Sequence, residues 1–386
     1  MRWPAYVEEC FRLLEKAGRR GWLVGGCVRD LAMGGTPGDW DMASDARPEE
    51  LLSLFPKAVP TGLKHGTVTA VLEGGTVEVT TLRREGGYTD GRHPDQVVFV
   101  DELEVDLARR DFTINAMAMD RRGRISDPFG GREDLRRGVI RCVGAPERRF
   151  SEDGLRMFRA VRFAARLGFA LEPGTAAALR TCAPLAERVS AERVREEVDK
   201  ILCSPRPEQA ELLFRDGLMT AWTARRAGAF HGLTRLPPRR LERWAALCAA
   251  VEEEPEPFLR RLKAERRLIR ACQAGWRLRE RGLPRDGTGW RRALARAGED
   301  GARAAAAMGG PEALAELEET LASGCCWQAA GLALTGGELA AMGLRGEEIG
   351  AARRWLLERV LDHPEDNRPE RLRSLAEGWR ASGPGR

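Results

Sequence analysis

The pattern of the sequence changes near Phe150, and this change limits the folds that the chain can adopt. Before it, short β-branched runs alternate with glycine-rich turns. The runs TVTAVLE and TVEVTTL, joined by Gly74-Gly75, predict a β-hairpin. After Phe150 the chain is rich in Ala, Leu, Glu and Arg at helical spacing, without strand signals. We therefore expect an α+β fold: a small mixed β-sheet with flanking helices, followed by an extended all-α part.

Helix breakers indicate how the all-α part is divided. A length of 386 residues suggests roughly two to three domains. We predict a head over 1–143 and three helical parts, a neck over 144–205, a body over 206–310 and a tail over 311–386. The two boundaries inside the helical part depend on Pro205 and Pro311.

Composition excludes several classes of protein. No apolar run is long enough to cross a bilayer, and the N-terminal segment predicts an amphipathic helix rather than a signal peptide. We therefore expect a cytoplasmic protein without membrane attachment. The nine cysteines include no C-x-x-C pair, which predicts free thiols. The four histidines are far apart, which argues against a histidine-rich metal site. The net charge of +5 is too small to indicate, by itself, that the protein binds nucleic acid.

A Gly-Gly turn follows a predicted buried strand over 22–24. The residues after Gly25-Gly26, CVRDLAM, are typical of a helix. Such a junction leaves backbone N–H groups free at the start of the helix, where they can bind a triphosphate. Arg29 would lie in the first helical turn and add a charge-assisted contact.

Two carboxylates, Asp39 and Asp41, follow this turn. Residues two apart in a strand share a face, so these side chains would converge. Mg²⁺ prefers such oxygen ligands together with phosphates and water, and two ions about 3.5–4 Å apart can hold both oxygens of an in-line displacement. Alone, the pair could be an ordinary surface turn, but the Gly-Gly turn upstream favours one phosphoryl-transfer site. Glu78 is a candidate third carboxylate, and the alternative is a solvent-facing strand residue.

These two motifs resemble the signature of the DNA polymerase β-like nucleotidyltransferase superfamily. The longer strings GGCVRD and GDWDMA are similar to class II tRNA nucleotidyltransferases and bacterial poly(A) polymerases. Further segments fit in order: RRDFTINAMA from Arg109, DPFGGREDLRRGVIRCVG from Asp127, SEDGLRMFRAVRFAARLGF from Ser151 and SAERVREEVDKIL from Ser190. The resemblance covers roughly the first half, and GGELAAMGLRGEEIG and HPEDNRPERL extend it more loosely. It implies a nucleotidyltransferase head, a neck that reads the base, and a tail that binds tRNA.

The resemblance also implies a role for individual residues. Asp39 and Asp41 would be the catalytic metal ligands, with Mg²⁺ as the cofactor. Gly26 and Arg29 would contact the nucleotide phosphates, and Arg110 would also hold the nucleotide. Four side chains would line the nucleotide pocket from one helix: Asp153, Arg156, Arg159 and Arg162. No general base is required, because a metal ion can lower the pKa of the attacking ribose hydroxyl.

Asp153 and Arg156 also suit base recognition on chemical grounds. Three residues apart, they would project from one face of a helix. A carboxylate can accept a hydrogen bond from an exocyclic amino group, and an arginine can donate one to a ring nitrogen. Cytosine and adenine both present an amino group beside such a nitrogen. Uracil or guanine would present a carbonyl to the carboxylate and leave buried acceptors unpaired. The alternative is a helix with ordinary surface charges.

Two residues of RRDFTINAMA have plain structural alternatives. Arg110 could pair with a local carboxylate such as Asp111 instead of a nucleotide. Asn115 could be a buried polar tie rather than a catalytic group. Phe112, Ile114 and Met117 are expected in the core.

The resemblance favours complete CCA addition to tRNA from CTP and ATP. Enzymes that add only CC carry a shortened loop before RRDFT, whereas the corresponding segment of this chain, Leu82–Ala108, has no deletion. PTGLKHGTVTAVL stands where related poly(A) polymerases carry a basic element. An A-adding enzyme and a poly(A) polymerase are the alternatives, and a non-catalytic RNA-binding protein is one of a different class. We expect no attached HD phosphohydrolase domain and no obligatory protein partner.

Overall fold

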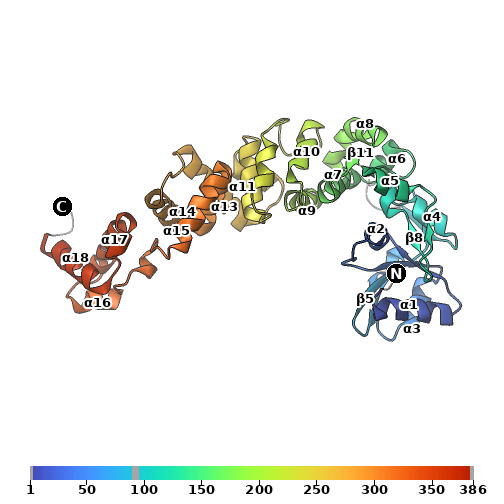
Figure 1. Ribbon diagram of the computed structural model, residues 1–386, viewed down its shortest axis with the longest axis horizontal. Helices are drawn as coiled ribbons and strands as arrows, with labels where there is room; N and C mark the ends of the chain where they lie inside the picture. Colours follow the sequence, from blue (N-terminus) through green and yellow to red (C-terminus); the bar gives the residue numbers. More distant parts are fainter. Residues whose placement is uncertain (1–2, 89–94, 383–386) are drawn as a thin grey trace. The chain divides into compact units, whose positions relative to one another are not determined.

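The computed structural model of the chain describes residues 3–88 and 95–382 (Figure 1). The chain forms two compact units, Met1–Arg226 and Ala227–Arg386. This division falls inside the predicted body over 206–310, so the finer division into head, neck, body and tail stays a prediction.

The first unit contains a seven-stranded sheet of order β3-β4-β5-β2-β1-β8-β9. Neighbouring strands of this sheet are antiparallel except β2 and β5, which are parallel. The predicted small mixed sheet is therefore confirmed. The predicted hairpin is β4 and β5, which turn at Glu73-Gly74. The strands are β1 (Gly21–Val24), β2 (Asp41–Ser44), β3 (Ala58–Gly62), β4 (Thr67–Leu72), β5 (Gly75–Thr81), β8 (Ala118–Met119) and β9 (Ile125–Ser126).

Ten helices complete the described part of the first unit, and the first four of them pack on this sheet. They are α1 (Ala5–Lys16), α2 (Gly26–Ala32), α3 (Pro48–Leu54), α4 (Leu103–Ala108), α5 (Gly131–Arg137), α6 (Pro146–Glu152), α7 (Leu155–Leu167), α8 (Pro173–Cys182), α9 (Ala191–Leu202) and α10 (Glu211–Arg215). Helix α7 packs on α9 and carries the buried side chains of Met157 and Phe158.

Alternation of side chains gives the sheet two buried faces. Met42 of β2 belongs to a core that includes residues of α1 and α3. Ala43, the next residue, belongs to a second core that includes Leu107 of α4. Because side chains alternate along a strand, Asp41 lies on the same side of the sheet as Ala43. The face covered by α4 therefore receives the carboxylate of β2.

Two small sheets lie outside the main one. Strands β6 (Arg83–Gly86) and β7 (Gln96–Phe99) form an antiparallel pair within the segment predicted as an undeleted loop. The part of that segment at 89–94 lies outside the described residues, and its role in product choice stays a prediction. Strands β10 (Val139–Ile140) and β11 (Ala170–Leu171) pair in parallel. The prediction of no strand after Phe150 is therefore wrong at β11, because two residues are too few to show an alternating pattern.

The second unit is helical throughout its described part. Trp244 and Trp290 are fully buried in its first portion, and α14 is interrupted at Gly298, where φ is +69°. Helices α16 to α18 share a separate core that includes Leu339, Leu356 and Leu372. The helices are α11 (Arg240–Ala250), α12 (Pro255–Arg261), α13 (Arg266–Glu280), α14 (Gly287–Gly309), α15 (Pro311–Ala322), α16 (Gly336–Ala341), α17 (Glu347–Asp362) and α18 (Pro369–Ser382).

None of the helices in residues 3–88 and 95–382 has both the length and the apolar character needed to span a membrane. All nine cysteines are free thiols, as predicted, and Cys10, Cys27 and Cys248 are among the buried ones.

Candidate active site

The Gly-Gly turn and the two aspartates meet because β1 and β2 are antiparallel neighbours. Leu23 pairs with Met42, so the residues that follow β1 lie beside those that precede β2. Asp41 is the first residue of β2, whereas Asp39 lies in a bend before it. The prediction that both carboxylates lie in one strand is therefore wrong for Asp39, because the strand pairing begins two residues later. Both side chains nevertheless line one cavity.

Gly25 brings two charged groups close to the turn. Its φ of +74° lies in the region that favours glycine. A Cβ at this position would lie 3.1 Å from Nη1 of Arg110 and 4.0 Å from Oδ2 of Asp41. The turn therefore needs glycine both for its backbone and for the close approach of Arg110.

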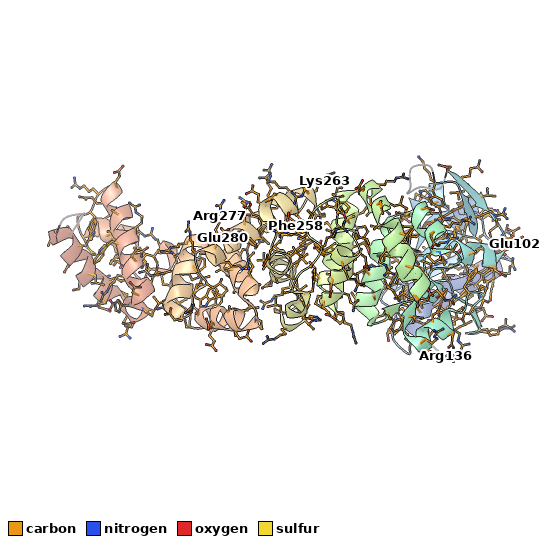
Figure 2. All side chains as sticks on the ribbon, turned by 90° about the horizontal axis from the view of Figure 1, so that it is seen from above. Glu102, Arg136, Phe258, Lys263, Arg277 and Glu280 are labelled. Atoms are coloured by element: carbon orange, nitrogen blue, oxygen red, sulfur yellow. The ribbon has the colours of Figure 1, made fainter. Side chains whose placement is uncertain are left out.

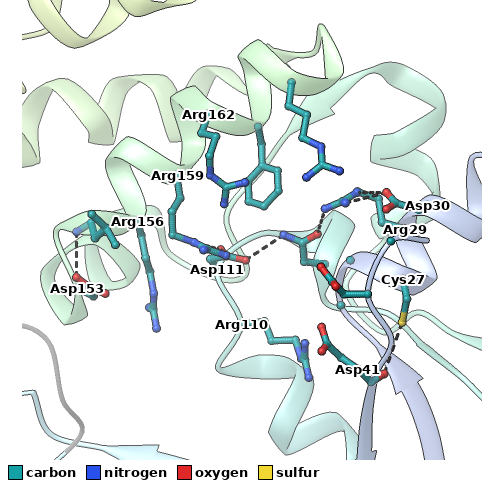
Figure 3. A pocket seen from close by; sticks show the side chains of 18 of the residues that line it. Cys27, Arg29, Asp30, Asp41, Arg110, Asp111, Asp153, Arg156, Arg159 and Arg162 are labelled. Atoms are coloured by element: carbon teal, nitrogen blue, oxygen red, sulfur yellow. Dashed lines mark hydrogen bonds and ion pairs between the residues drawn. The ribbon is translucent and has the colours of Figure 1, made fainter. Parts of the chain in front are cut away.

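The cavity at this turn has a volume of about 650 Å³ (Figure 3). All of its lining residues belong to the first unit. It brings together nine residues predicted from the sequence, Gly26, Arg29, Asp39, Asp41, Arg110, Asp153, Arg156, Arg159 and Arg162, whereas the candidate third carboxylate, Glu78, is exposed and does not line the cavity. The wall is strongly charged, with carboxylates at β2 and arginines from α7.

The carboxylates at β2 are suited to a divalent cation. Burial, together with the charges of Glu78 and Asp39, raises the pKa of Asp41 to about 6, although Arg110 opposes this shift. Glu78 lies opposite Asp41 in the parallel register of β5 and β2. This crowding of negative charge favours a bound cation. In the described chain no three His, Cys, Asp or Glu side chains are arranged to hold a metal ion.

Arg110 extends beside Asp41 into the cavity (Figure 3). Its Nη2 pairs with Asp106 at 3.2 Å, and the alternative partner considered above, Asp111, is bound to Arg159 instead. Its Nε is buried and has no hydrogen-bond partner among the residues described. Because Nε is itself shielded from solvent, an anionic ligand in the cavity would approach Arg110 through the part of the guanidinium that lines the cavity.

Asp111, Asn115 and Arg29 form a polar network along one wall. Asn115 Oδ1 accepts from Nη1 of Arg29 at 2.8 Å, and its Nδ2 donates to Asp111 at 3.3 Å. Asn115 is thus a buried polar tie. Nε and Nη2 of Arg29 donate to Asp30, and the Arg29 side chain is only 4% exposed. Its phosphate contact stays a prediction.

The Asp111 carboxylate is held in its charged form. Burial raises its pKa, but the charge of Arg159 and hydrogen bonds from Arg159 and the Phe112 backbone outweigh burial and lower the pKa to about 2. The arginines Arg29, Arg159 and Arg162 also lie over the ring of Phe163, with Arg162 Cζ 4.2 Å from its centroid. Phe163 thus packs the arginines of α7 together.

The four residues predicted on one helix do not share it. Asp153 lies between α6 and α7 with φ of −150°, and α7 begins at Leu155. The prediction failed because Asp153 Oδ1 accepts from the Leu155 backbone N–H at 3.0 Å, which supports a new helix start. Arg156, Arg159 and Arg162 do come from α7.

Each member of the predicted base-reading pair has a protein partner. Asp153 Oδ2 accepts from Nη2 of Arg193 of α9 at 2.8 Å. Arg156 forms an ion pair with Glu152 and donates to the Arg149 carbonyl at 3.1 Å. Arg162 is likewise paired with Glu197 of α9 at 2.6 Å.

Sequence reasoning gave no site role to Arg193, Asp111 or Phe163, all of which line the cavity. Arg193 lies 40 residues from Asp153 in the sequence, so no local spacing connects them. Asp111 was visible in RRDFT only as a possible partner of Arg110. Phe163 could be recognised only as an apolar position in a helix.

The comparisons with known proteins agree with this geometry. Residues 21–141 match the family described as "Poly A polymerase head domain", and residues 168–222 match "Probable RNA and SrmB- binding site of polymerase A". The fold and site thus define a nucleotidyltransferase.

Individual relatives identify the family more closely. The chain is 47% identical over 270 residues to a CCA-adding enzyme of Geobacillus kaustophilus. The aligned region covers 67% of this chain and 66% of the relative. It is similar to the crystal structure of the Bacillus stearothermophilus CCA-adding enzyme in complex with CTP, with 35% identity, a TM-score of 0.76 and 94% of each chain covered. A Thermotoga maritima CCA-adding enzyme complexed with tRNA shares the fold, with 22% identity, a TM-score of 0.72 and coverage of 98% of this chain and 96% of that one.

The chain belongs to the CCA-adding enzyme family. Membership in this family of nucleotidyltransferases implies a divalent metal ion. The sequence match spans slightly less than two thirds of the length of the Geobacillus kaustophilus relative, 66%.

Proposed function

We propose that this protein adds CCA to the 3′ end of tRNA from CTP and ATP, without a template and with release of diphosphate. The observation that carries the proposal is one cavity lined by paired aspartates, by an arginine with an unpaired donor, and by an Asp/Arg pair suited to bases. The proposal is also supported by the 35% identical relative, whose structure was solved in complex with CTP.

Asp39 and Asp41 are the proposed ligands of Mg²⁺. The raised pKa of Asp41, caused by burial and by neighbouring carboxylates, supports a bound cation there. Bound Mg²⁺ supplies charge stabilisation for the triphosphate and lowers the pKa of the attacking ribose hydroxyl. The two carboxylates fix its position beside the Gly-Gly turn, and Glu78 is a candidate to support Asp41 through the adjoining strand.

Arg110 is the proposed anchor of the triphosphate. Its buried Nε has no partner among the described residues, and its guanidinium lies beside Asp41 and Gly25. A charge-assisted hydrogen bond from the part of this guanidinium that lines the cavity would orient the nucleotide. Because phosphoryl transfer depends mainly on positioning and charge stabilisation, orientation of this kind contributes directly to the rate.

Asp153 and Arg156 are the proposed readers of the base. An ionised carboxylate has about four acceptor sites, so Asp153 can accept from an amino group while it stays paired with Arg193. Arg156 would donate to the ring nitrogen beside that amino group. Cytosine and adenine satisfy both residues, whereas the carbonyl of uracil or guanine opposes the Asp153 carboxylate.

Helix α13 provides a proposed surface for tRNA phosphates. Arg266, Arg270 and Arg277 are exposed and line a groove of about 370 Å³ with residues of α12. Spacings of four and seven residues place them on one face of the helix over about 16 Å. Figure 2 labels Arg277 in this region. A row of arginines suits the charged backbone of RNA.

The test is release of diphosphate from a tRNA transcript that ends before CCA. We expect release with CTP, ATP and Mg²⁺, with one diphosphate for each nucleotide added, and none after addition of EDTA. A matched reaction with UTP and GTP should release little. Absence of diphosphate release in the complete mixture would contradict the proposal.

The cytoplasmic location, the lack of an obligatory protein partner and the tRNA-binding role of the tail also stay predictions.

A further inference from the structure

A buried carboxylate behind the cavity is not explained by the proposed chemistry. Asp106 of α4 is 1% exposed and does not line the cavity. Its Oδ1 accepts from Nε and Nη2 of Arg109 at 2.9 and 2.7 Å and from the Arg83 backbone N–H at 3.3 Å. Its Oδ2 accepts from Nη2 of Arg110 at 3.2 Å. Asp106 thus connects Arg110 to Arg109, which also lines the cavity, and to the backbone of Arg83 outside it.

Asp106 restrains the direction of Arg110. An arginine side chain has several rotatable bonds, and ordering it costs conformational entropy. The ion pair with Asp106 holds Nη2 on the protein side, while Nη1 lies beside Gly25 and Nε faces no partner among the described residues. The free donors of Arg110 are therefore ordered before a ligand arrives.

Asp106 is in turn connected to strand β6. Arg109 Nη1 donates to Oε1 of Glu85 at 3.1 Å, and Glu85 is also paired with Arg83 at 2.7 Å. The Glu85 side chain is 7% exposed, and Tyr88 donates to its Oε2 at 2.5 Å. The charges alternate along the sequence of contacts from Glu85 through Arg109 and Asp106 to Arg110.

Asp106 is charged at neutral pH. Burial raises its pKa, but the charges of Arg109 and Arg110 outweigh burial and hold the pKa below its usual value. A neutral side chain at this position would leave two arginines without their shared counter-charge.

We propose that Asp106 is a positioning residue for the nucleotide: it fixes Arg110 toward the triphosphate and is itself fixed through Arg109 by Glu85 of β6. The inference rests on the proposed function of this cavity. It adds a residue that acts through Arg110 and never touches the substrate. It also makes the position of Arg110 depend on the β6–β7 pair.

The first test compares Asp106→Asn with Asp134→Asn. Asp134 is similarly buried, 2% exposed, and accepts from Thr113 and Arg141, but it does not line the cavity. Removal of a residue that orients a metal ligand typically costs about 10–100-fold, and we take the same range for a residue that orients Arg110. We expect Asp106→Asn to raise KM for CTP and ATP by about this factor with a smaller change in kcat. CTP affinity without tRNA, measured by calorimetry, should fall equally. Asp134→Asn should lower Tm but leave KM unchanged.

The second test is a double-mutant cycle with Arg110→Ala. If Asp106 acts through Arg110, Asp106→Asn should change KM by no more than about twofold in the Arg110→Ala background. Glu85→Gln should raise KM less than Asp106→Asn, and its effect should disappear in the Asp106→Asn background. An Asp106→Asn effect of full size without Arg110 would overturn the inference.

Further variants and outcomes distinguish a loss of stability, a failure of the positioning role and a failure of the proposed function. Should Asp106→Asn melt below the assay temperature, Asp106→Glu keeps the charge and shifts its position, and it should still raise KM by several-fold. A folded Asp106→Asn variant with wild-type KM, in a protein that adds CCA, would refute the positioning role alone. Failure of the wild-type protein to add any nucleotide would instead refute the proposed function.

Discussion

The two units of the molecule use arginine in different ways. In the first unit, arginines around the cavity are buried or half-buried and bound to buried carboxylates, as in Arg159 with Asp111 and Arg109 with Asp106. In the second unit, many pairs are exposed, as in Arg267 with Asp300, where 82% and 38% of the side chains are accessible. Breaking a buried pair costs about 3–5 kcal/mol, whereas an exposed pair contributes about 0–1 kcal/mol.

This difference shows what each unit requires of its sequence. Around the cavity, the identity of each charged residue is fixed by a specific partner, so motifs are recognisable. The proposed RNA surface of α13 would require only suitably spaced positive charge, which many sequences provide. Substitutions in the first unit should therefore change chemistry and nucleotide choice, while those on α13 should change tRNA affinity.

The largest effect is expected from Asp41→Ala or Asp39→Ala. Loss of the proposed metal ligand should lower the rate of nucleotide addition by about 10³-fold or more, since metal stabilisation is worth several kcal/mol. tRNA binding, measured by filter binding, should change little. Asp101→Ala removes an exposed carboxylate of the same unit and should have normal activity. Loss of tRNA binding with retained turnover would contradict the metal assignment.

The same assay can decide the role of Glu78. A loss in Glu78→Gln comparable with that in Asp41→Ala would assign it as a third catalytic carboxylate, and near-normal turnover would leave it as an exposed strand residue.

The next largest effect concerns nucleotide choice. Asp153→Ala combined with Arg156→Ala should lower the preference for CTP over UTP by about 10²-fold, because the acceptor that opposes uracil is gone. Competition between labelled CTP and UTP measures this ratio. Undiminished rejection of UTP would show that other residues read the base.

A smaller effect is expected on α13. The triple change Arg266→Gln, Arg270→Gln and Arg277→Gln should weaken tRNA binding by about tenfold at low salt and reduce the salt dependence by about 2–3 units of slope. KM for CTP should stay normal. Arg267→Gln, on the same helix but paired with Asp300, serves as the control. An unchanged salt slope in the triple variant would place the RNA elsewhere.

The smallest effect separates backbone strain from crowding at the turn. Gly25→Ala and Gly123→Ala both place alanine at positive φ, and Gly25→Ala should lower Tm more because φ +74° with ψ −132° is a conformation almost confined to glycine. Only Gly25 has Arg110 within 4 Å of the added Cβ, so only Gly25→Ala should raise KM, by several-fold. Equal KM values in the two variants would argue against the close approach as a functional feature.

Much of the head could be predicted because its signals are local. The hairpin of β4 and β5 follows from two alternating runs and a glycine turn. The meeting of Gly25 with Asp41 could be inferred because a turn and a carboxylate pair make sense only as one site. The antiparallel pairing of β1 and β2 supplies the physical reason.

The remaining features depend on long-range contacts. The helix break at Asp153 and its ion pair with Arg193 of α9 follow from tertiary packing rather than from spacing. The two-residue strand β11 exists only through its pairing with β10. Asp106 resembles an ordinary helix residue in the sequence, and its buried contact with Arg110 becomes visible only in the fold.

The most direct test of the central claim uses tRNA transcripts that end before CCA, after C, or after CC. Each is incubated with Mg²⁺ and CTP, ATP or both, and product lengths are read on a sequencing gel. The account predicts addition of C, C and A to the shortest substrate, followed by a stop. Extension of the CC-ended substrate alone, long untemplated A tails, or no extension would contradict it.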